Sequence, residues 1–295
     1  MNFFMPKRLL GGIFLTLAAS VWGGMFVSVK IAVQYIPPIP LVWMRYIIAF
    51  IVLLGVIIYQ RENLKITRKD ILLLLSISVI GHTISIVTQE YGTMFSSAQM
   101  GSVITSATPA FMLIFATWIL KEKMTVRKIL SIILATVGVL LIAGLDGMDM
   151  SKQLGALCST IAALTWALMS VMLKLIPSRY SPLQINFYAV LTAIICLTPV
   201  NLPTVSSLPW DKILQPDIIA CVVYMGAIST AIAFLLWNKG LLLMEAGASG
   251  LFFFFQPVVG TFLGWLILDE QITWNFWIGS MLIFIGVFLV TVKNE

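Results

Sequence analysis

One stretch of this chain occurs twice, and the repeat limits the folds that are open to the rest. Residues 98–125 read AQMGSVITSATPAFMLIFATWILKEKMT, and residues 246–273 read AGASGLFFFFQPVVGTFLGWLILDEQIT. Adding 148 to a residue number in the first stretch gives its partner in the second. The comparison aligns Pro109 with Pro257, Glu122 with Glu270 and Gly138 with Gly286, and, at an offset of 144, Trp22 with Trp166 and Lys30 with Lys174. Two copies of one unit, at residues 1–148 and 149–295, are therefore predicted.

The composition places both copies in a membrane. The chain is 60% apolar and 10% charged, whereas about 25% of the residues in an ordinary soluble domain are charged. A membrane-spanning helix needs about 20 mostly apolar residues. Ten segments meet this requirement, at residues 9–34, 39–59, 70–92, 97–119, 127–145, 153–176, 182–200, 216–238, 245–268 and 274–292. We therefore expect an all-α membrane protein with ten transmembrane helices, five from each copy.

The basic residues predict which side of the membrane each loop faces. With the amino terminus in the cytoplasm, fourteen Lys and Arg residues fall in or beside inner loops, and only Lys152 and Lys212 fall in outer loops. Because cytoplasmic loops carry an excess of Lys and Arg, both termini are predicted to be cytoplasmic. The net charge of +6 then reflects membrane topology, and no nucleic-acid partner is expected.

An odd number of spans in each copy means that the second copy enters the bilayer from the opposite side. Such inverted repeats recur in secondary transporters, with the substrate site between the halves near the middle of the bilayer. One unit in two orientations can give two similar conformations, one open to each side. The odd number of spans in each copy, and the inverted repeat that follows from it, thus predict a carrier that works by alternating access.

The third span carries a polar stripe. Ser78, His82, Ser85 and Gln89 are spaced by four, three and four residues, so they share one face of an α-helix. Because polar groups facing lipid are costly, this face is expected to line a cavity or to contact another helix. His82 is either a neutral imidazole hydrogen-bonded to a neighbouring helix or a cavity residue that binds substrate or takes part in proton coupling.

Lys30, Arg45 and Glu90 form a second polar set, in the outer third of their spans. Glu90 could neutralise Lys30 or Arg45, because an unpaired charge there would be expensive. The two basic side chains could instead extend to the outer interface. An ion pair at this level could also serve as an extracellular gate.

Two prolines occupy equivalent positions within the fourth and ninth spans. Pro109 and Pro257 would each remove a backbone donor and bend the helix, and paired interruptions in matching spans point to a transporter site. A tolerated kink without a mechanistic role is the alternative. The predicted substrate cavity combines the polar stripe with polar, aromatic and methionine residues inside the other spans. Its residues are Trp22, Met25, Ser78, His82, Ser85, Gln89, Ser102, Thr105, Trp166, Met169, Tyr224, Phe234, Trp237, Phe254 and Gln256.

Several kinds of chemistry have no support in the sequence. The three cysteines lie in apolar runs without metal-ligand spacing, and no phosphate-binding glycine-rich loop occurs. Nucleophile–histidine arrangements and acidic clusters with metal spacing do not stand out either. We therefore expect no metal, no cofactor and no enzymatic activity.

The whole chain resembles a known group of membrane carriers. The resemblance rests on Trp22-Gly23 with Lys30, on Arg45 at the start of the second span, on the run from Ser97-Ala98 through Pro109 to Glu122, and on its echo from Ala246 through Pro257 to Glu270. These features are similar to those of EamA-type proteins of the drug/metabolite transporter superfamily. The resemblance implies a basket of ten helices whose cavity is built by spans one, three, four, six, eight and nine. It also implies a multi-pass carrier of the bacterial cytoplasmic membrane, often coupled to protons.

The resulting hypothesis is a secondary-active exporter of small organic solutes, either amino acids and other metabolites or drug-like compounds. An uptake carrier for a small metabolite and a membrane scaffold or sensor without transport activity are the alternatives. The expected partners are the small-molecule substrate, the lipid bilayer and protons, and the protein could work as a monomer or as a homodimer.

Overall fold

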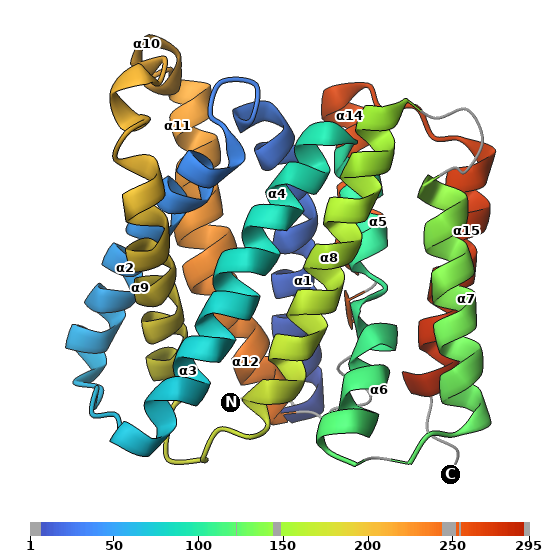
Figure 1. The fold of residues 1–295 in the computed structure, drawn as a ribbon, viewed down its shortest axis with the longest axis horizontal. Coiled ribbons are helices and arrows are strands. Elements are labelled where there is room, and N and C mark those ends of the chain that lie inside the picture. Colours follow the sequence, from blue (N-terminus) through green and yellow to red (C-terminus); the bar gives the residue numbers. More distant parts are fainter. Residues whose placement is uncertain (1–6, 122, 144–148, 244–251, 254, 292–295) are drawn as a thin grey trace, which may run out of the picture.

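The computed structural model describes residues 7–121, 123–143, 149–243, 252–253 and 255–291, and this part of the chain contains helices and connections but no strand (Figure 1). The helices are α1 (Lys7–Ala32), α2 (Pro38–Gln60), η1 (Arg68–Asp70), α3 (Ile71–Ile77), η2 (Ser78–Ser85), α4 (Ile86–Phe95), α5 (Ala98–Thr105), α6 (Thr108–Ile119), α7 (Val126–Ala143), α8 (Met150–Leu173), α9 (Pro182–Asn201), η3 (Val205–Ser207), α10 (Trp210–Ile213), α11 (Pro216–Val223), η4 (Tyr224–Ile232), α12 (Ala233–Leu243), α14 (Phe255–Leu268) and α15 (Trp274–Thr291).

Among the described residues, seven helical segments are long and apolar enough to cross a membrane: Leu9–Ala32, Pro38–Gln60, Arg68–Phe95, Ala98–Ile119, Met150–Leu173, Pro182–Asn201 and Pro216–Trp237. Large apolar side chains on their outer faces are exposed, as expected for surfaces that meet lipid tails. The expected all-helical membrane protein is therefore confirmed. The number of ten spans stays a prediction for the remaining apolar helices α7, α14 and α15.

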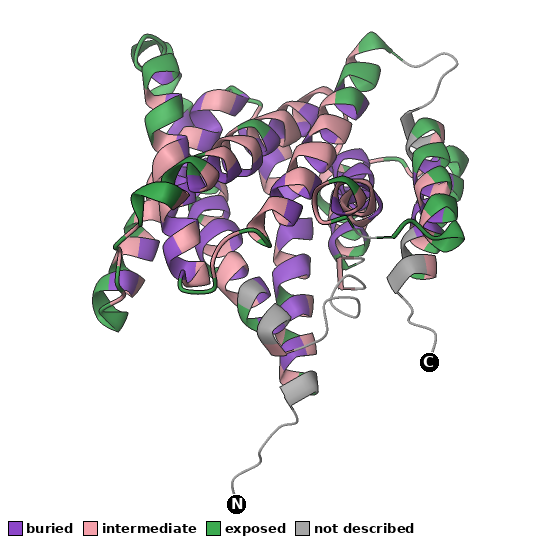
Figure 2. Ribbon diagram, turned by 60° about the horizontal axis from the view of Figure 1, so that its bottom comes forward, coloured by how far each residue is buried: buried purple, intermediate pink, exposed green. Residues whose placement is uncertain are grey.

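α1 is the central helix. It packs along α12 and α14, whereas α4 packs on α8 and α2 on α9. Figure 2 shows buried residues concentrated on these inner helices. Close approach depends on glycine at the contact with α14, because a Cβ on Gly23 would lie 2.5 Å from the carbonyl oxygen of Gln256. These contacts bring helices from both halves of the chain around one centre.

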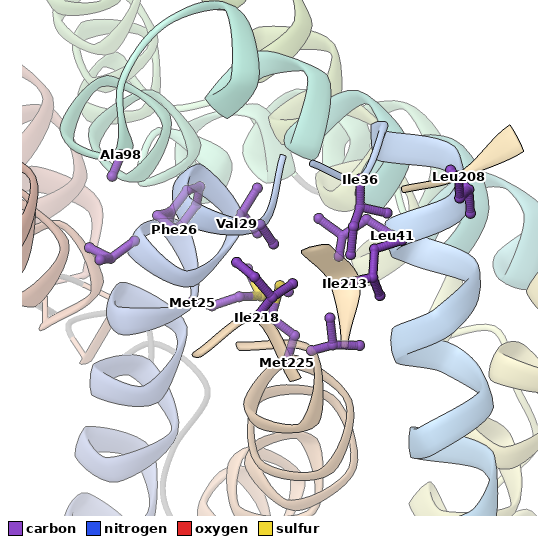
Figure 3. Packing of buried hydrophobic residues seen from close by; sticks show 13 residues of the cluster. Met25, Phe26, Val29, Ile36, Leu41, Ala98, Leu208, Ile213, Ile218 and Met225 are labelled. Atoms are coloured by element: carbon purple, nitrogen blue, oxygen red, sulfur yellow. The ribbon is translucent and has the colours of Figure 1, made fainter. Parts of the chain in front are cut away.

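An apolar cluster closes the space between α1, α2 and α11 (Figure 3). Met25 of α1 lies beside Ile218 and Met225, and Ile36 and Leu41 fill the turn from α1 to α2. Between membrane-spanning helices such side chains stabilise the contact by van der Waals packing. The cluster fixes the position of α1 against η4, and both elements contribute to the site described below.

The helix pair α7–α15 lies at one side of the bundle (Figure 1). Its two helices pack mainly on each other. Gly138 and Gly286, which align in the repeat, make the contact close: a Cβ on Gly138 would lie 2.6 Å from the Gly279 carbonyl oxygen, and one on Gly286 2.8 Å from that of Ser131. This pair lies apart from the centre and contributes nothing to the cavity.

The connections fall at two ends of the bundle. The start of α1 and the end of α15 lie at the same end, the lower one in Figure 1, together with the connections α2–α3, α6–α7 and α8–α9. These connections and their flanks carry Arg61, Lys65, Arg68, Lys69, Lys121, Lys123, Arg127, Lys128, Lys174 and Arg179. The basic residues thus gather at one end, as the sequence predicted. The assignment of that end to the cytoplasm remains a proposal.

Two spans contain a π-helical segment between α-helical parts. η2 interrupts the third span at Ser78–Ser85, and η4 interrupts the eighth at Tyr224–Ile232. Hydrogen bonds from residue i to residue i+5 replace the α-helical pattern there, and such segments are often found at functional sites. Their widened turns shift the side chains that follow to a different face of the helix.

Pro109 lies in the first turn of α6, and Pro257 lies close to the first described residue of α14. α5 ends at Thr105 and α6 begins at Thr108, so the fourth span is interrupted just before Pro109. Pro257 is likewise the third residue of α14. Proline is tolerated in the first turn because its missing N–H would have no helical partner there. The expected mid-helix kink at Pro109 is therefore replaced by a break in the fourth span.

Candidate functional site

A cavity with a volume of about 40 Å³ lies at the centre of the bundle. Such a space holds a few water molecules. Its wall is formed by Trp22 and Met25 of α1, Arg45 of α2, Ile86 and Gln89 of α4, Thr105 of α5, Thr108 of α6, Ala162, Ala163 and Trp166 of α8, Phe234 of α12, Phe253, and Gln256 of α14. The wall therefore draws on both halves of the chain.

Aromatic rings form one part of the wall. The ring of Phe234 lies 5.4 Å from that of Trp22 and 5.5 Å from that of Trp166, so it joins the two tryptophans that align in the repeat. Phe253 stacks on Trp22 at 5.9 Å. The indole N–H of Trp22 donates to the Ser229 carbonyl oxygen at 3.0 Å, and this bond fixes the ring against η4. Such a surface favours flat, apolar ligands.

A buried guanidinium forms the polar part. Arg45 is 1% exposed, and its Nη1 donates to Oε1 of Glu90 at 2.8 Å. Its Nε and Nη2 donate to the hydroxyl of Thr230 at 3.2 and 2.8 Å, and Nη2 also contacts Sδ of Met25 at 3.1 Å. Arg45 thus connects α2 to the third span through Glu90 and to the eighth through Thr230. Of the two predicted partners for Glu90, Arg45 is the one that the structure shows.

Two polar atoms beside this ion pair have no hydrogen-bond partner among the described residues. They are Oε2 of Glu90 and Nε2 of Gln89, and both are buried. Gln89 lines the cavity, whereas Glu90 is fully buried behind its wall. Because an unpaired buried polar atom costs about 1–3 kcal/mol, both atoms are candidates for contact with water, and Nε2 of Gln89, on the wall, is also a candidate for contact with a ligand.

A second polar contact joins the fourth and ninth spans. Nε2 of Gln256 donates to the hydroxyl of Thr105 at 2.9 Å, and both residues line the cavity. Thr108 donates to the Thr105 carbonyl oxygen at 2.6 Å, within the break between α5 and α6. The break therefore places two hydroxyl groups in the wall.

Lys30 has a different role from the one expected. Its Nζ donates to the carbonyl oxygens of Thr93, Met94 and Ser96 at 3.1, 3.0 and 2.6 Å. These are the last carbonyl groups of α4, which lack helical donors and carry the negative end of the helix dipole. Lys30 thus caps α4, and among the described residues it is Arg45 and not Lys30 that pairs with Glu90.

Glu270 caps a helix start in the same region. Its carboxylate accepts the backbone N–H groups of Ala98 and Gln99 at 2.7 and 2.9 Å. The connection after α14 therefore lies beside the beginning of α5, whereas Lys121 lies at the other end of the fourth span, after α6. The aligned fourth and ninth spans run in opposite directions.

About half of the predicted cavity residues line the cavity: Trp22, Met25, Gln89, Thr105, Trp166, Phe234 and Gln256. Phe254 lies outside the described residues, and its neighbour Phe253 is on the wall. The others are away from the wall: Ser78, His82, Ser85, Ser102, Met169, Tyr224 and Trp237.

The π-helical segment explains why the polar stripe of the third span is divided. Ser78, His82 and Ser85 lie in η2, where the spacing of an α-helix does not hold. Ser78 donates to the Leu74 carbonyl oxygen and Ser85 to that of Ala162. The His82 ring lies 5.9 Å from Trp166 and 5.7 Å from Phe234, and its two nitrogens have no partner among the described residues. Only Gln89, after η2, reaches the cavity.

Five wall residues were not predicted from the sequence, namely Ile86, Thr108, Ala162, Ala163 and Phe253. Helical spacing could have found some of them. Ile86 lies three residues before Gln89, and Ala162 and Ala163 lie four and three residues before Trp166, so each shares a face with a predicted residue. Small and aliphatic side chains are too common in membrane helices to be singled out without that reference.

The described part of the chain holds no group of three or more His, Cys, Asp or Glu side chains that could bind a metal ion. Its three cysteines, Cys158, Cys196 and Cys221, are free thiols. The arrangement therefore offers a small, mixed aromatic and polar cavity with one buried ion pair, which suits reversible binding of a solute.

Comparison with known proteins relates the chain to a family of transporters. The model of the EamA-like transporter family matches residues 9–144 and again residues 153–292. The chain is 28% identical over 291 residues to the uncharacterized transporter YoaV of Bacillus subtilis, with 97% of each chain covered. It is 29% identical to an uncharacterized transporter of Archaeoglobus fulgidus, with 96% of this chain and 99% of the relative covered. A solved crystal structure, described only as that of a protein, has a TM-score of 0.64 at 15% identity and covers 96% of this chain and 95% of its own.

Proposed function

The chain belongs to the EamA-like transporter family of the drug/metabolite transporter superfamily, and on that premise we propose that it exports small organic solutes as a secondary-active carrier by alternating access. The observation that carries this proposal is the central cavity, whose wall combines side chains from both segments that match the family model. A site shared by two halves can be exposed to either side when the halves move against each other. The residues on its wall are proposed to contact the solute.

The small volume of the cavity fits one step of such a cycle. A space of about 40 Å³ is far below the roughly 300–1,000 Å³ of typical ligand sites, so a solute can bind only after the wall opens. The capping of α5 by Glu270 holds one end of the bundle together in this conformation. In the proposed orientation, that end is the outer one.

The two copies are proposed to be inverted repeats, with the domains at residues 1–148 and 149–295 and with both termini in the cytoplasm of a bacterial cell. Support comes from the opposite directions of the fourth and ninth spans and from the basic residues gathered at one end. Cysteine labelling from each side of the membrane tests this topology. Labelling of positions 123 and 271 from the same side would contradict it.

Transport is tested by flux of labelled solutes through proteoliposomes of known orientation. Outward movement in the cellular sense is expected, and an inward pH gradient should accelerate it if protons are exchanged for the solute. Accumulation inside cells that depends on the protein would instead indicate an uptake carrier. Absence of flux for amino acids, nucleobases, organic anions and cationic dyes would favour a scaffold or sensor.

The substitution Glu90→Gln separates transport from folding. It removes the negative charge beside Arg45 but keeps a hydrogen-bond acceptor of similar shape. If the ion pair takes part in gating, flux falls while the amount of protein in the membrane stays near normal. Loss of the protein from the membrane would instead assign the pair to structure alone.

A further inference from the structure

We propose that the central cavity selects small organic anions, in which a single carboxylate on a flat apolar body binds Arg45 and Gln89. The inference rests on the proposed carrier function and names the class of solute that the carrier takes. It follows from the sign of the charge on the wall, from the unsaturated donors of two side chains and from the rings that surround the remaining space.

The Arg45–Glu90 pair is neutral overall, but its cation lies on the wall and its carboxylate lies behind it. Among the described residues that line the cavity, Arg45 is the one charged side chain. Glu90 pairs with Arg45 but does not line the cavity. An ammonium group in the cavity would therefore meet a guanidinium and no carboxylate, whereas an anion would meet a cation directly.

The guanidinium of Arg45 can accept a second anionic partner. Glu90 uses one oxygen and one N–H of Nη1, which leaves the two-point contact of a full arginine–carboxylate pair unmade. Nη2 faces Sδ of Met25 at 3.1 Å, and a thioether sulfur is a weak acceptor. Because a methionine side chain is flexible, Met25 can turn away and leave its place to a carboxylate oxygen.

Gln89 supplies a second donor at the same end of the cavity. Its Nε2 is buried and has no hydrogen-bond partner among the described residues, although Gln89 lines the wall. An amide N–H in that position is satisfied by an acceptor on the ligand. In the proposed complex, Arg45 binds one oxygen of the carboxylate and Gln89 binds the other.

The remaining wall fits the body of the solute. Trp22, Trp166, Phe234 and Phe253 present aromatic rings, which favour flat, apolar groups over flexible polar ones. The solute enters when these rings and Met25 move apart, since a volume of about 40 Å³ is too small for a benzyl group. A second charged group, such as the ammonium of a zwitterion, would find no described carboxylate on the wall and is expected to weaken binding.

The experiment compares four probes that share a benzyl group. Phenylacetate carries the carboxylate, phenylacetamide is its neutral analogue, phenethylamine is cationic, and phenylalanine adds an ammonium to the carboxylate. Isothermal titration of the full-length protein in lipid nanodiscs measures the affinity of each probe. Phenylacetate is expected to bind at least tenfold more tightly than any of the other three.

Two variants test whether Arg45 is the origin of this preference. In the double variant Arg45→Gln with Glu90→Gln, both charges are removed together, so neither is left buried alone. It should bind phenylacetate and phenylacetamide within threefold of each other. The control Arg179→Gln removes an arginine that pairs with Asp70 outside the cavity and should keep the tenfold preference.

Each outcome decides between the two proposals. If the amide, the amine or the zwitterion binds as tightly as phenylacetate, or if none of the four binds at millimolar concentration, selectivity for organic anions is overturned. The carrier function would still stand if flux assays showed movement of another solute. If phenylacetate binds with the expected preference but no solute crosses the membrane, the anion site stands and the carrier function fails.

Discussion

The third and eighth spans share a backbone feature but carry different side chains. Each is α-helical at both ends and π-helical between them, at η2 in the third span and at η4 in the eighth. Each π-helical segment contains a buried glycine, Gly81 or Gly226, at a spacing of 145 residues. Because π-helical segments are rare, their presence in both parts that match the family model indicates a property of the family's unit.

The polar side chains do not repeat. α4 of the third span supplies Glu90 and Gln89, whereas α12 of the eighth supplies Phe234. Arg45 of α2 contacts both spans, through the carboxylate of Glu90 on one side and the hydroxyl of Thr230 on the other. The two halves therefore share a backbone arrangement but supply different side chains to the wall: the third span supplies Gln89, and the eighth supplies Phe234. This asymmetry can be tested by measuring the unfolding free energy of variants on each side of the site, by thermal or denaturant unfolding of the purified protein in detergent.

The largest effect is expected for Glu90→Ala, which leaves the Arg45 guanidinium buried without its counter-charge. Removal of one partner from a buried ion pair costs about 3–5 kcal/mol of unfolding free energy. The control is Asp217→Ala, which removes an exposed acidic residue from the first turn of α11 in the eighth span; it should cost no more than about 1 kcal/mol. Equal losses for the two variants would mean that removing the buried ion pair destabilises the protein no more than removing an exposed carboxylate.

A smaller loss is expected for Thr230→Val, the corresponding change on the eighth-span side of Arg45. Valine keeps the shape of threonine but removes the hydroxyl that accepts from Nε and Nη2 and donates to the Met225 carbonyl oxygen at 2.7 Å. Hydrogen bonds to a charged group are worth about 1.5–3 kcal/mol, so the unfolding free energy should fall by that amount. A loss as large as that of Glu90→Ala would show that the two spans hold Arg45 equally.

The sequence predicted the scaffold better than the contacts within it. Apolar run lengths indicated an all-helical membrane protein, and the pairs of aligned residues indicated the family. These features follow from composition and spacing, which the chain carries directly. The pairing of Glu90 with Arg45 was one of two open alternatives, because counting along helices gives the depth of a side chain in the membrane but not which neighbour it faces.

The π-helical segment η2 was the main obstacle to predicting the site. With α-helical spacing, Ser78, His82, Ser85 and Gln89 share a face, but η2 turns the first three away from the cavity. Nothing in the residue types of 78–85 announces such a segment, since it depends on packing against α8. Lys30 was misjudged for a related reason: its partners are backbone carbonyl groups, which every residue carries and no side-chain pattern reveals.

The glycines of the two π-helical segments test whether the shared backbone is equally constrained. A Cβ on Gly226 would lie 2.6 Å from the Arg45 carbonyl oxygen, whereas one on Gly81 would meet the Met169 side chain at 2.3 Å. Overpacking costs about 1–3 kcal/mol, and Gly226→Ala should lie at the upper end because backbone cannot turn aside as a side chain can. Gly55→Ala is the control: no atom lies within 4 Å of its Cβ, so it should stabilise the helix by about 0.5–1 kcal/mol. A larger loss for Gly81→Ala would reverse the expected order of the two spans.

The smallest effect is expected for Ser85→Ala, at the residue that corresponds to Thr230 when 145 is added to its number. The Ser85 hydroxyl is buried and donates to the Ala162 carbonyl oxygen at 2.8 Å, which links η2 to α8 at the cavity wall. That carbonyl lies inside α8 and keeps its helical hydrogen bond, so only one neutral hydrogen bond is lost, at a cost of about 0.5–1.5 kcal/mol. Ser76→Ala, which removes an exposed hydroxyl bonded within its own helix, should change the unfolding free energy by less. A cost for Ser85→Ala equal to that for Thr230→Val would mean that both hydroxyls matter alike, and the asymmetry of the site would then rest on the charges alone.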